Sequence, residues 1–125
     1  MSSMLFQVAT YLAAHGIGTV DSDIFMGRFA ESPETSICLY QTGGRAPSPA
    51  NKTDEPGLQV VARGIDYEAA DAKILAIEAV LHGLVNTSMS GTRYISIFAD
   101  GARISLGWKN QRVSIAQNYQ IVRSA

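Results

Sequence analysis

Two apolar runs decide the fold of this chain: SICLY at residues 36–40 and LQVVAR at residues 58–63. Between them lies a Gly/Pro segment that begins QTGGRAPSP at residue 41 and ends in Pro56-Gly57. Short apolar runs bounded by glycine and proline are typical of strands. We therefore expect two strands joined by a long extended loop, residues 43–56. Loops of this length in a small domain are usually functional or disordered. We interpret this one as a contact arm, mobile in the free protein and ordered by a neighbour.

The flanking sequence predicts two helices. The first is expected over residues 4–15, with Ser2 or Ser3 as its N-cap, and the second over residues 67–82, with Asp66 as its N-cap. One stripe of the second helix is apolar and should face the sheet: Ala70, Ile74, Ile77 and Leu81. Small apolar residues cover much of its remaining surface. This helix is therefore expected to pack on a second side too, against the first helix or a neighbouring subunit.

The remaining pattern predicts strands. A short strand is expected over residues 24–29, and three more over residues 94–99, 102–108 and 113–122, after a polar loop at 86–92. Asp100-Gly101 is a strong hairpin signal between two of them. The predicted fold is α+β, with two helices packed on one mixed, mostly antiparallel β-sheet that ends in a three-stranded meander.

Length and composition favour one domain, residues 1–125. Apolar residues make up 46% of the chain and charged residues 17%, which is a globular composition with little charge. The net charge of −1 argues against a dedicated nucleic-acid binder. No signal peptide or membrane-length apolar run is recognisable, so we expect synthesis in a reducing cytoplasm and no membrane partner.

The charge is unevenly distributed along the chain. Residues 1–90 hold five basic and ten acidic residues, whereas residues 91–125 hold five basic residues and one acidic residue, Asp100. Two interpretations remain open: opposite halves that meet head to tail between copies, or solvated charges on one monomer. The first interpretation gives a candidate interface made of Arg45, Lys52, Asp54 and Glu55 in the loop, and Arg112 and Arg123 near the C-terminus.

No motif in the chain predicts catalysis or a cofactor. Cys38 is the only cysteine, has no adjacent base and is expected to be a small buried residue. His15 and His82 lie at the two helix ends, without the spacing of a metal site. Tyr94 and Trp108 are expected to be core or interface anchors. We therefore expect no enzyme activity, no metal and no cofactor; a small enzyme or nucleotide-binding domain is the disfavoured alternative.

Six short motifs occur in a distinctive order. They are LAAHGIG at residues 12–18, IFMG at 24–27, YQTGG at 40–44, PGLQV at 56–60, YEAA at 67–70 and LHGL at 81–84. Together they resemble the phage minor capsid protein family, which is similar to the tail terminators of long-tailed phages. The resemblance covers most of the chain. Gln41 stands where the family often has an acidic residue.

The resemblance implies a structural role in the virion. Members of this family form a homo-oligomeric ring, commonly a hexamer, at the head-proximal end of the tail tube. The ring ends tube growth and joins the tail to the head, so the implied partners are the tail tube protein and a head-completion protein of the neck. DNA would pass through the ring without sequence-specific binding. The alternative within the same class is another neck component, such as a head-closure or adaptor protein.

Overall fold

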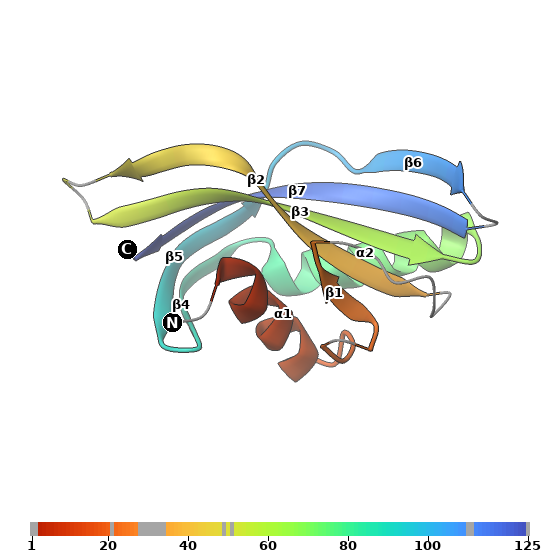
Figure 1. Cartoon of the computed structure of the whole chain (residues 1–125), viewed down its shortest axis with the longest axis horizontal. Coiled ribbons are helices and arrows are strands. Elements are labelled where there is room, and N and C mark those ends of the chain that lie inside the picture. The colour runs from red at the N-terminus through yellow and green to blue at the C-terminus, as the bar shows by residue number, and fades with distance from the viewer. Residues whose placement is uncertain are drawn as a thin grey trace.

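A computed structural model describes residues 3–20, 22–27, 35–48, 50, 52–109 and 112–124, without the side chains of 45–48 and 109. Within these residues it contains two helices and one seven-stranded sheet (Figure 1). In chain order the elements are α1 (Met4–Ala14), β1 (Ile24–Met26), β2 (Ser36–Ser48), β3 (Thr53–Gly64), α2 (Tyr67–Leu81), β4 (Leu84–Met89), β5 (Thr92–Ala99), β6 (Ile104–Lys109) and β7 (Arg112–Ser124).

The sheet is mixed and mostly antiparallel, as the sequence predicted. Its strand order is β1-β2-β3-β7-β5-β4, and β6 pairs with β7 beside this path. Among the described strands only the β1–β2 pair is parallel. The long strand β7 is therefore central, because it pairs with β3 along one edge and with β5 and β6 along the other.

The predicted C-terminal meander forms only in part. β6 and β7 make the expected antiparallel pair, but β5 pairs with β7 instead of with β6. β7 is long enough to take β6 along residues 112–116 and β5 along residues 119–123 on the same edge. Asp100-Gly101 thus marks a change of direction, with Gly101 at φ +84°, and no two-residue hairpin.

The predicted polar loop at residues 86–92 is also wrong. It holds most of β4 and a tight turn into β5, where Met89 lies opposite Thr92. Ser90 and Gly91 have φ angles of +50° and +85°. Positive φ at both central residues is the geometry of the turns that favour two-stranded hairpins. The Ser90-Gly91 pair in the sequence was therefore an indication of a hairpin turn, but the polar composition of β4 suggested a loop instead.

Both helices begin where their sequences predict and end one residue earlier than predicted, with His15 and His82 as C-caps. The Ser3 hydroxyl accepts a hydrogen bond from the Phe6 amide at 3.2 Å, and Asp66 caps α2 by accepting from the Ala69 amide at 2.8 Å. Gly16, with φ +78°, follows the end of α1 in the left-handed conformation that glycine adopts without strain. Side-chain caps of this kind typically contribute about 1 kcal/mol each.

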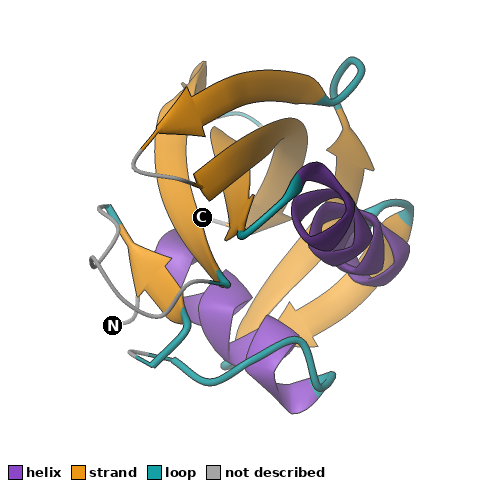
Figure 2. Cartoon of the chain, turned by 90° about the vertical axis from the view of Figure 1, so that its right-hand side faces the viewer, coloured by secondary structure: helices purple, strands orange, loops and turns teal. Residues whose placement is uncertain are grey.

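One face of the sheet carries both helices and the core. α1 lies against β1, β2 and β4, whereas α2 lies against β3, β5 and β7. Figure 2 shows that the sheet is curved and that the two helices cover different parts of it. The predicted stripe of α2 is fully buried, together with Leu58 and Val60 of β3. Each buried Leu or Ile side chain stabilises the fold by about 1.5–3 kcal/mol relative to its exposed state. The other side of α2 is exposed at Ala72, Leu75, Ala76 and Ala79.

The predicted long loop is wrong, because most of residues 43–56 lie in paired strands. β2 and β3 continue through this segment as an antiparallel hairpin, with register shifts between Thr42 and Arg45 and between Arg45 and Ser48. Irregularities of this kind accommodate the glycine and proline residues that suggested a loop. β7 also pairs along β3 as far as Thr53. We call residues 42–57 the arm; in Figure 1 it extends past the helices at the left of the molecule.

Candidate assembly surface

The arm contains four of the six predicted interface residues. Arg45 lies in β2 opposite Glu55 of β3, Lys52 is exposed at the turn, and Asp54 lies in β3 beside the end of β7. Arg123 is the register partner of Asp54 across the β3–β7 pair. Arg112 starts β7 and therefore lies at the opposite end of that strand. The structure thus brings Asp54 and Arg123 together and places Arg112 far from both.

Asp54 and Arg123 form an ion pair within one chain. Both Nε and Nη2 of Arg123 lie 3.1 Å from Oδ2 of Asp54. Because both side chains are mostly buried, this pair is screened less than a surface pair. The sequence suggested that Arg123 meets an acidic residue of another copy. Its carboxylate partner here belongs to the same chain, in the arm.

The ion pair continues into a buried polar network that reaches α1. The Tyr94 hydroxyl donates a hydrogen bond to Oε1 of Gln7 at 2.6 Å, and Arg123 Nη1 donates to the same oxygen at 3.3 Å. Gln7 Nε2 donates to the Thr92 hydroxyl at 2.8 Å. Gln7 is only 2% exposed. We call Gln7, Thr92, Tyr94, Arg123 and Asp54 the anchor network, because it ties the arm to α1, β5 and β7.

Tyr94 takes part in the anchor network as a neutral phenol. Desolvation raises the pKa of its phenol, although Arg123 acts in the opposite direction. The neutral phenol can donate its proton to Gln7, as the geometry requires. Sequence reasoning identified Tyr94 as an anchor but missed Gln7. Its position one turn after Ser3 and beside Val8, on the buried side of α1, was the available signal.

A second set of ion pairs also joins the acidic and basic halves inside the chain. Nε of Arg103 lies 3.4 Å from Oδ1 of Asp71, and its Nη1 lies 4.0 Å from Oε2 of Glu78. Both acidic residues belong to α2. The charge asymmetry along the sequence is therefore partly satisfied within the monomer, and it does not by itself require contact between copies.

Two arginines gather at the end of the sheet remote from the arm. Burial lowers the pKa of Arg63, and the neighbouring Arg112 guanidinium lowers it further. The two residues approach each other because Gly64, next to Arg63, pairs with Val113, next to Arg112. Arg112 thus belongs to a basic end of the molecule, away from the other predicted interface residues.

The edge strand β6 presents large apolar side chains to solvent. Ile104 is 48% exposed, Leu106 55% and Trp108 67%. Strand edges and apolar patches of this kind commonly mark contacts with other chains. Of the two aromatic residues expected as anchors, Tyr94 lies in the core and Trp108 is exposed on this strand.

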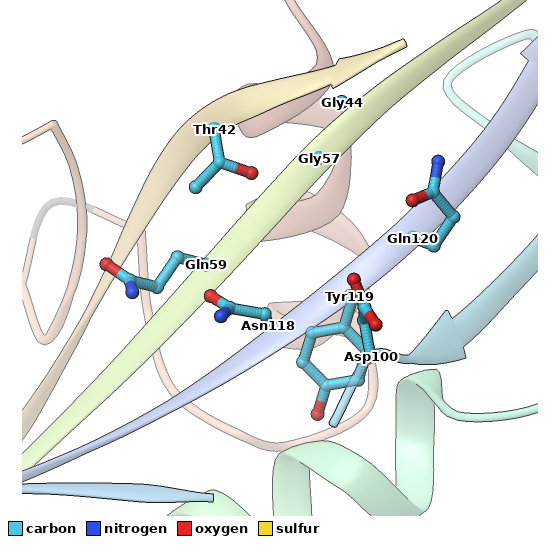
Figure 3. A pocket seen from close by; sticks show the side chains of 8 residues that line it. All are labelled: Thr42, Gly44, Gly57, Gln59, Asp100, Asn118, Tyr119 and Gln120. Carbon is cyan, nitrogen blue, oxygen red and sulfur yellow. The ribbon is translucent and has the colours of Figure 1, made fainter. Parts of the chain in front are cut away.

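A polar pocket lies on the sheet face opposite the helices, near the base of the arm (Figure 3). Gln59 alternates with the buried Leu58 and Val60, so it faces away from the core. The pocket has a volume of about 210 Å³ and is lined by Thr42, Gly44, Gly57, Gln59, Asp100, Asn118, Tyr119 and Gln120. We call it the amide pocket, after Gln59, Asn118 and Gln120; the Tyr119 ring points away from these amides.

Two side-chain amide atoms of residues that line the pocket lack a hydrogen-bond partner among the described residues. They are the Asn118 carbonyl oxygen Oδ1 and the Gln120 amide nitrogen Nε2, and both atoms are buried. Gly57 keeps the pocket open, because a Cβ at this position would collide with the Thr42 hydroxyl. The two amide atoms have almost no solvent-accessible surface, whereas the pocket itself is lined by the exposed Thr42 and Asp100 and by the half-buried Gln59, Asn118 and Gln120.

Within the described part of the chain, no three His, Cys, Asp or Glu side chains form a group that could hold a metal ion. Cys38 is buried, and burial raises the pKa of its thiol, which disfavours the nucleophilic thiolate. His15 lies with its Nδ1 2.9 Å from the Tyr11 carbonyl oxygen, and His82 accepts a hydrogen bond from the Ala99 amide. No described helix is both long enough and apolar enough to span a membrane.

The curved sheet carries both helices on one face and exposes large apolar side chains on the edge strand β6. Residues 11–116 match the family model of the bacteriophage tail terminator proteins. The chain therefore belongs to this family and is a phage tail structural protein. This confirms the family resemblance that the sequence motifs indicated.

The fold is shared with a solved virion structure. A chain from the virion of a native gene transfer agent particle is similar with a TM-score of 0.65 at 11% sequence identity, and the similarity covers 97% of this chain and 92% of that one. At this identity the likeness shows the fold alone. A comparison with curated protein sequences finds no match.

Proposed function

We propose that this chain is the tail terminator of a long-tailed phage, acting as a ring of six copies at the head-proximal end of the tail tube. In this role the ring stops growth of the tube and joins the tail to the head. The observation that carries the proposal is the family match over residues 11–116. Two surfaces, the arm and the apolar edge of β6, support it because each is exposed and suited to a neighbouring chain.

The ring is proposed to contact two kinds of protein. One face meets the last ring of the tail tube protein, and the other meets a head-completion protein of the neck. A ring of identical copies needs two different surfaces that fit each other head to tail. DNA passes through the centre without sequence-specific contact, which agrees with the net charge of −1.

The proposed role involves no catalysis, metal or nucleotide. The buried, uncharged thiol of Cys38 supports this view, because it leaves the chain without an activated cysteine. Elemental analysis of purified protein should find no stoichiometric metal. A metal present at one atom per chain would contradict this part of the proposal.

Deletion of the gene from its phage tests the proposed function. Without a terminator, tail tubes should vary in length and should not join to heads, and purified protein added to such an extract should restore joining. Another neck component, such as a head-closure or adaptor protein, predicts a different result: tails of uniform, normal length that remain unjoined. Electron microscopy of the mutant lysate separates the two. Infectious particles with normal tails would contradict both.

A further inference from the structure

We propose that the amide pocket receives the Lys52 side chain of a neighbouring copy, so that the arm turn of one subunit engages the base of the arm of the next. This inference rests on the proposed ring and names one of its contacts. It follows from the chemistry of the pocket, the charge of its rim and the distance along the arm.

The pocket is built for a polar occupant. Thr42 and Asp100 are exposed and Gln59, Asn118 and Gln120 are half-buried, so hydroxyl, carboxylate and amide groups line this space. The oxygens of these groups can accept hydrogen bonds from the three N–H donors of a lysine ammonium, so a basic side chain of another chain is a better occupant than an apolar one. At about 210 Å³ the pocket is smaller than the roughly 300–1,000 Å³ typical of small-molecule sites. Its size suits one long side chain.

The charge of the pocket selects a cation. Asp100 is the one charged residue among the described residues that line it, and its carboxylate makes no ion pair with a described residue. A lone carboxylate beside neutral amides repels phosphate and attracts an ammonium or guanidinium group. This chemistry disfavours the DNA backbone as the occupant and favours a basic side chain.

The chain offers such a side chain on a projecting element. Arg103 and Arg123 are already ion-paired within the chain, and Lys73 donates to the Ile17 carbonyl. Lys52 is exposed at the arm turn and forms no ion pair with a described residue. Lys52 lies five residues before Gly57 in the sequence, and five residues of a strand span roughly 16 Å. Lys52 therefore cannot reach the pocket of its own chain.

A contact between the turn of one arm and the base of another is heterologous. Such contacts join copies head to tail and close into a ring when the rotation between subunits permits it. The amide pocket and Lys52 would then be the two halves of one repeated contact, with Lys52 placed against Asp100 of the next copy.

Disulfide trapping in assembled particles tests this contact. Phage carrying Lys52→Cys together with Asp100→Cys is purified and oxidised, and the protein is examined on a non-reducing gel. The native Cys38 is buried, so it should not react. We expect covalent oligomers larger than a dimer, because each copy links to two neighbours. Each single variant can give at most a dimer, and Lys52→Cys with Glu68→Cys, exposed on α2, is the matched control.

Charge reversal gives an independent measurement in purified protein. Lys52→Glu and Asp100→Lys should each weaken self-association about two- to fivefold, and the double variant should restore it. Particles whose tails end in a ring of this protein, but which yield no more covalent oligomers than the control, would overturn the contact and leave the proposed function intact. Particles whose tail ends hold no such ring would overturn the proposed function itself.

Discussion

At the scale of single residues, Arg123 is the side chain whose role changes most between sequence and structure. The sequence showed a basic residue near the C-terminus and acidic residues in the arm, but it could not show that Asp54 and Arg123 are register partners. Register depends on how β3 aligns with β7, which is a long-range property. The role of Gln7 could not be predicted for the same reason. Its hydrogen-bond partners Tyr94 and Arg123 are far away in the sequence, and only the fold brings them next to it.

Replacing Arg123 tests the anchor network. Arg123→Gln should lower the free energy of unfolding by about 2 kcal/mol, because it leaves the Asp54 carboxylate partly buried without its partner. Urea denaturation followed by circular dichroism measures the change. Arg93→Gln is the matched control, since Arg93 is exposed on β5, and it should change the free energy by less than about 0.5 kcal/mol. Equal changes in the free energy of unfolding for the two variants would show that the anchor network does not stabilise the fold more than an exposed arginine does.

Buried tyrosines predict how stability depends on pH. Burial raises the pKa of Tyr40 to about 12 and also raises the pKa values of Tyr94 and Tyr119. The unfolded chain ionises its tyrosines near pH 10, before the folded chain does. The contribution of these tyrosines to the free energy of unfolding should therefore be constant up to about pH 9 and decrease as the pH rises from 10 to 12. The buried Cys38 thiol, whose pKa is also raised, adds a decrease in the same direction that begins at lower pH.

Urea denaturation at pH 8, 9, 10 and 11 checks this dependence. Tyr40→Phe should make the decrease shallower, whereas Tyr67→Phe, at an exposed position, should leave it unchanged. A free energy of unfolding that rises above pH 10 would contradict the assignment.

At the scale of elements, local signals predicted the helices well and the strand connections poorly. The caps Ser3 and Asp66 and the stripe of α2 act over a few residues, so the sequence reveals them directly. The arm was mistaken for a loop because its glycine and proline residues normally break strands. In the structure these residues occupy irregular positions that pairing with β3 and β7 supports. Pairing partners lie far away in the sequence, which is also why β5 was wrongly placed beside β6.

The arm turn can be tested without disturbing the anchor network. Replacing all of residues 43–56 would remove Asp54, so any loss of assembly could reflect a weakened fold. Replacing only residues 49–52 with Asn-Gly keeps the ion pair and joins Ser48 to Thr53 by a two-residue hairpin turn. The free energy of unfolding of the variant should differ from that of the parent chain by less than about 1 kcal/mol. It should nevertheless give tails of irregular length or heads and tails that fail to join, as seen by electron microscopy.

Full infectivity of phage that carries this turn variant would contradict the prediction that the arm turn is needed for assembly. The arm turn would then be a tolerated surface feature, and the assembly contacts would have to lie elsewhere, with the apolar edge of β6 as the next surface to examine.

At the scale of the whole molecule, the sequence was sufficient for fold class and family and insufficient for the contact surface. Ordered motifs spread over the chain pointed to the tail terminator proteins, and the family model matches over residues 11–116. The distribution of charge along the sequence suggested contacts between copies, yet two basic residues, Arg103 and Arg123, form ion pairs inside the monomer. The amide pocket left no sequence signal, because Gln59, Asn118 and Gln120 come from two strands that only the fold brings together.

In the proposed function, this chain forms a ring that ends the tail tube. A cryo-electron microscopy reconstruction of the neck of the intact particle, at side-chain resolution, tests it most directly. We predict six copies of this chain in a closed ring at the head-proximal end of the tube, between the last tube ring and a head-completion protein. A single copy per particle, or a ring located anywhere other than the end of the tube, would contradict the claim.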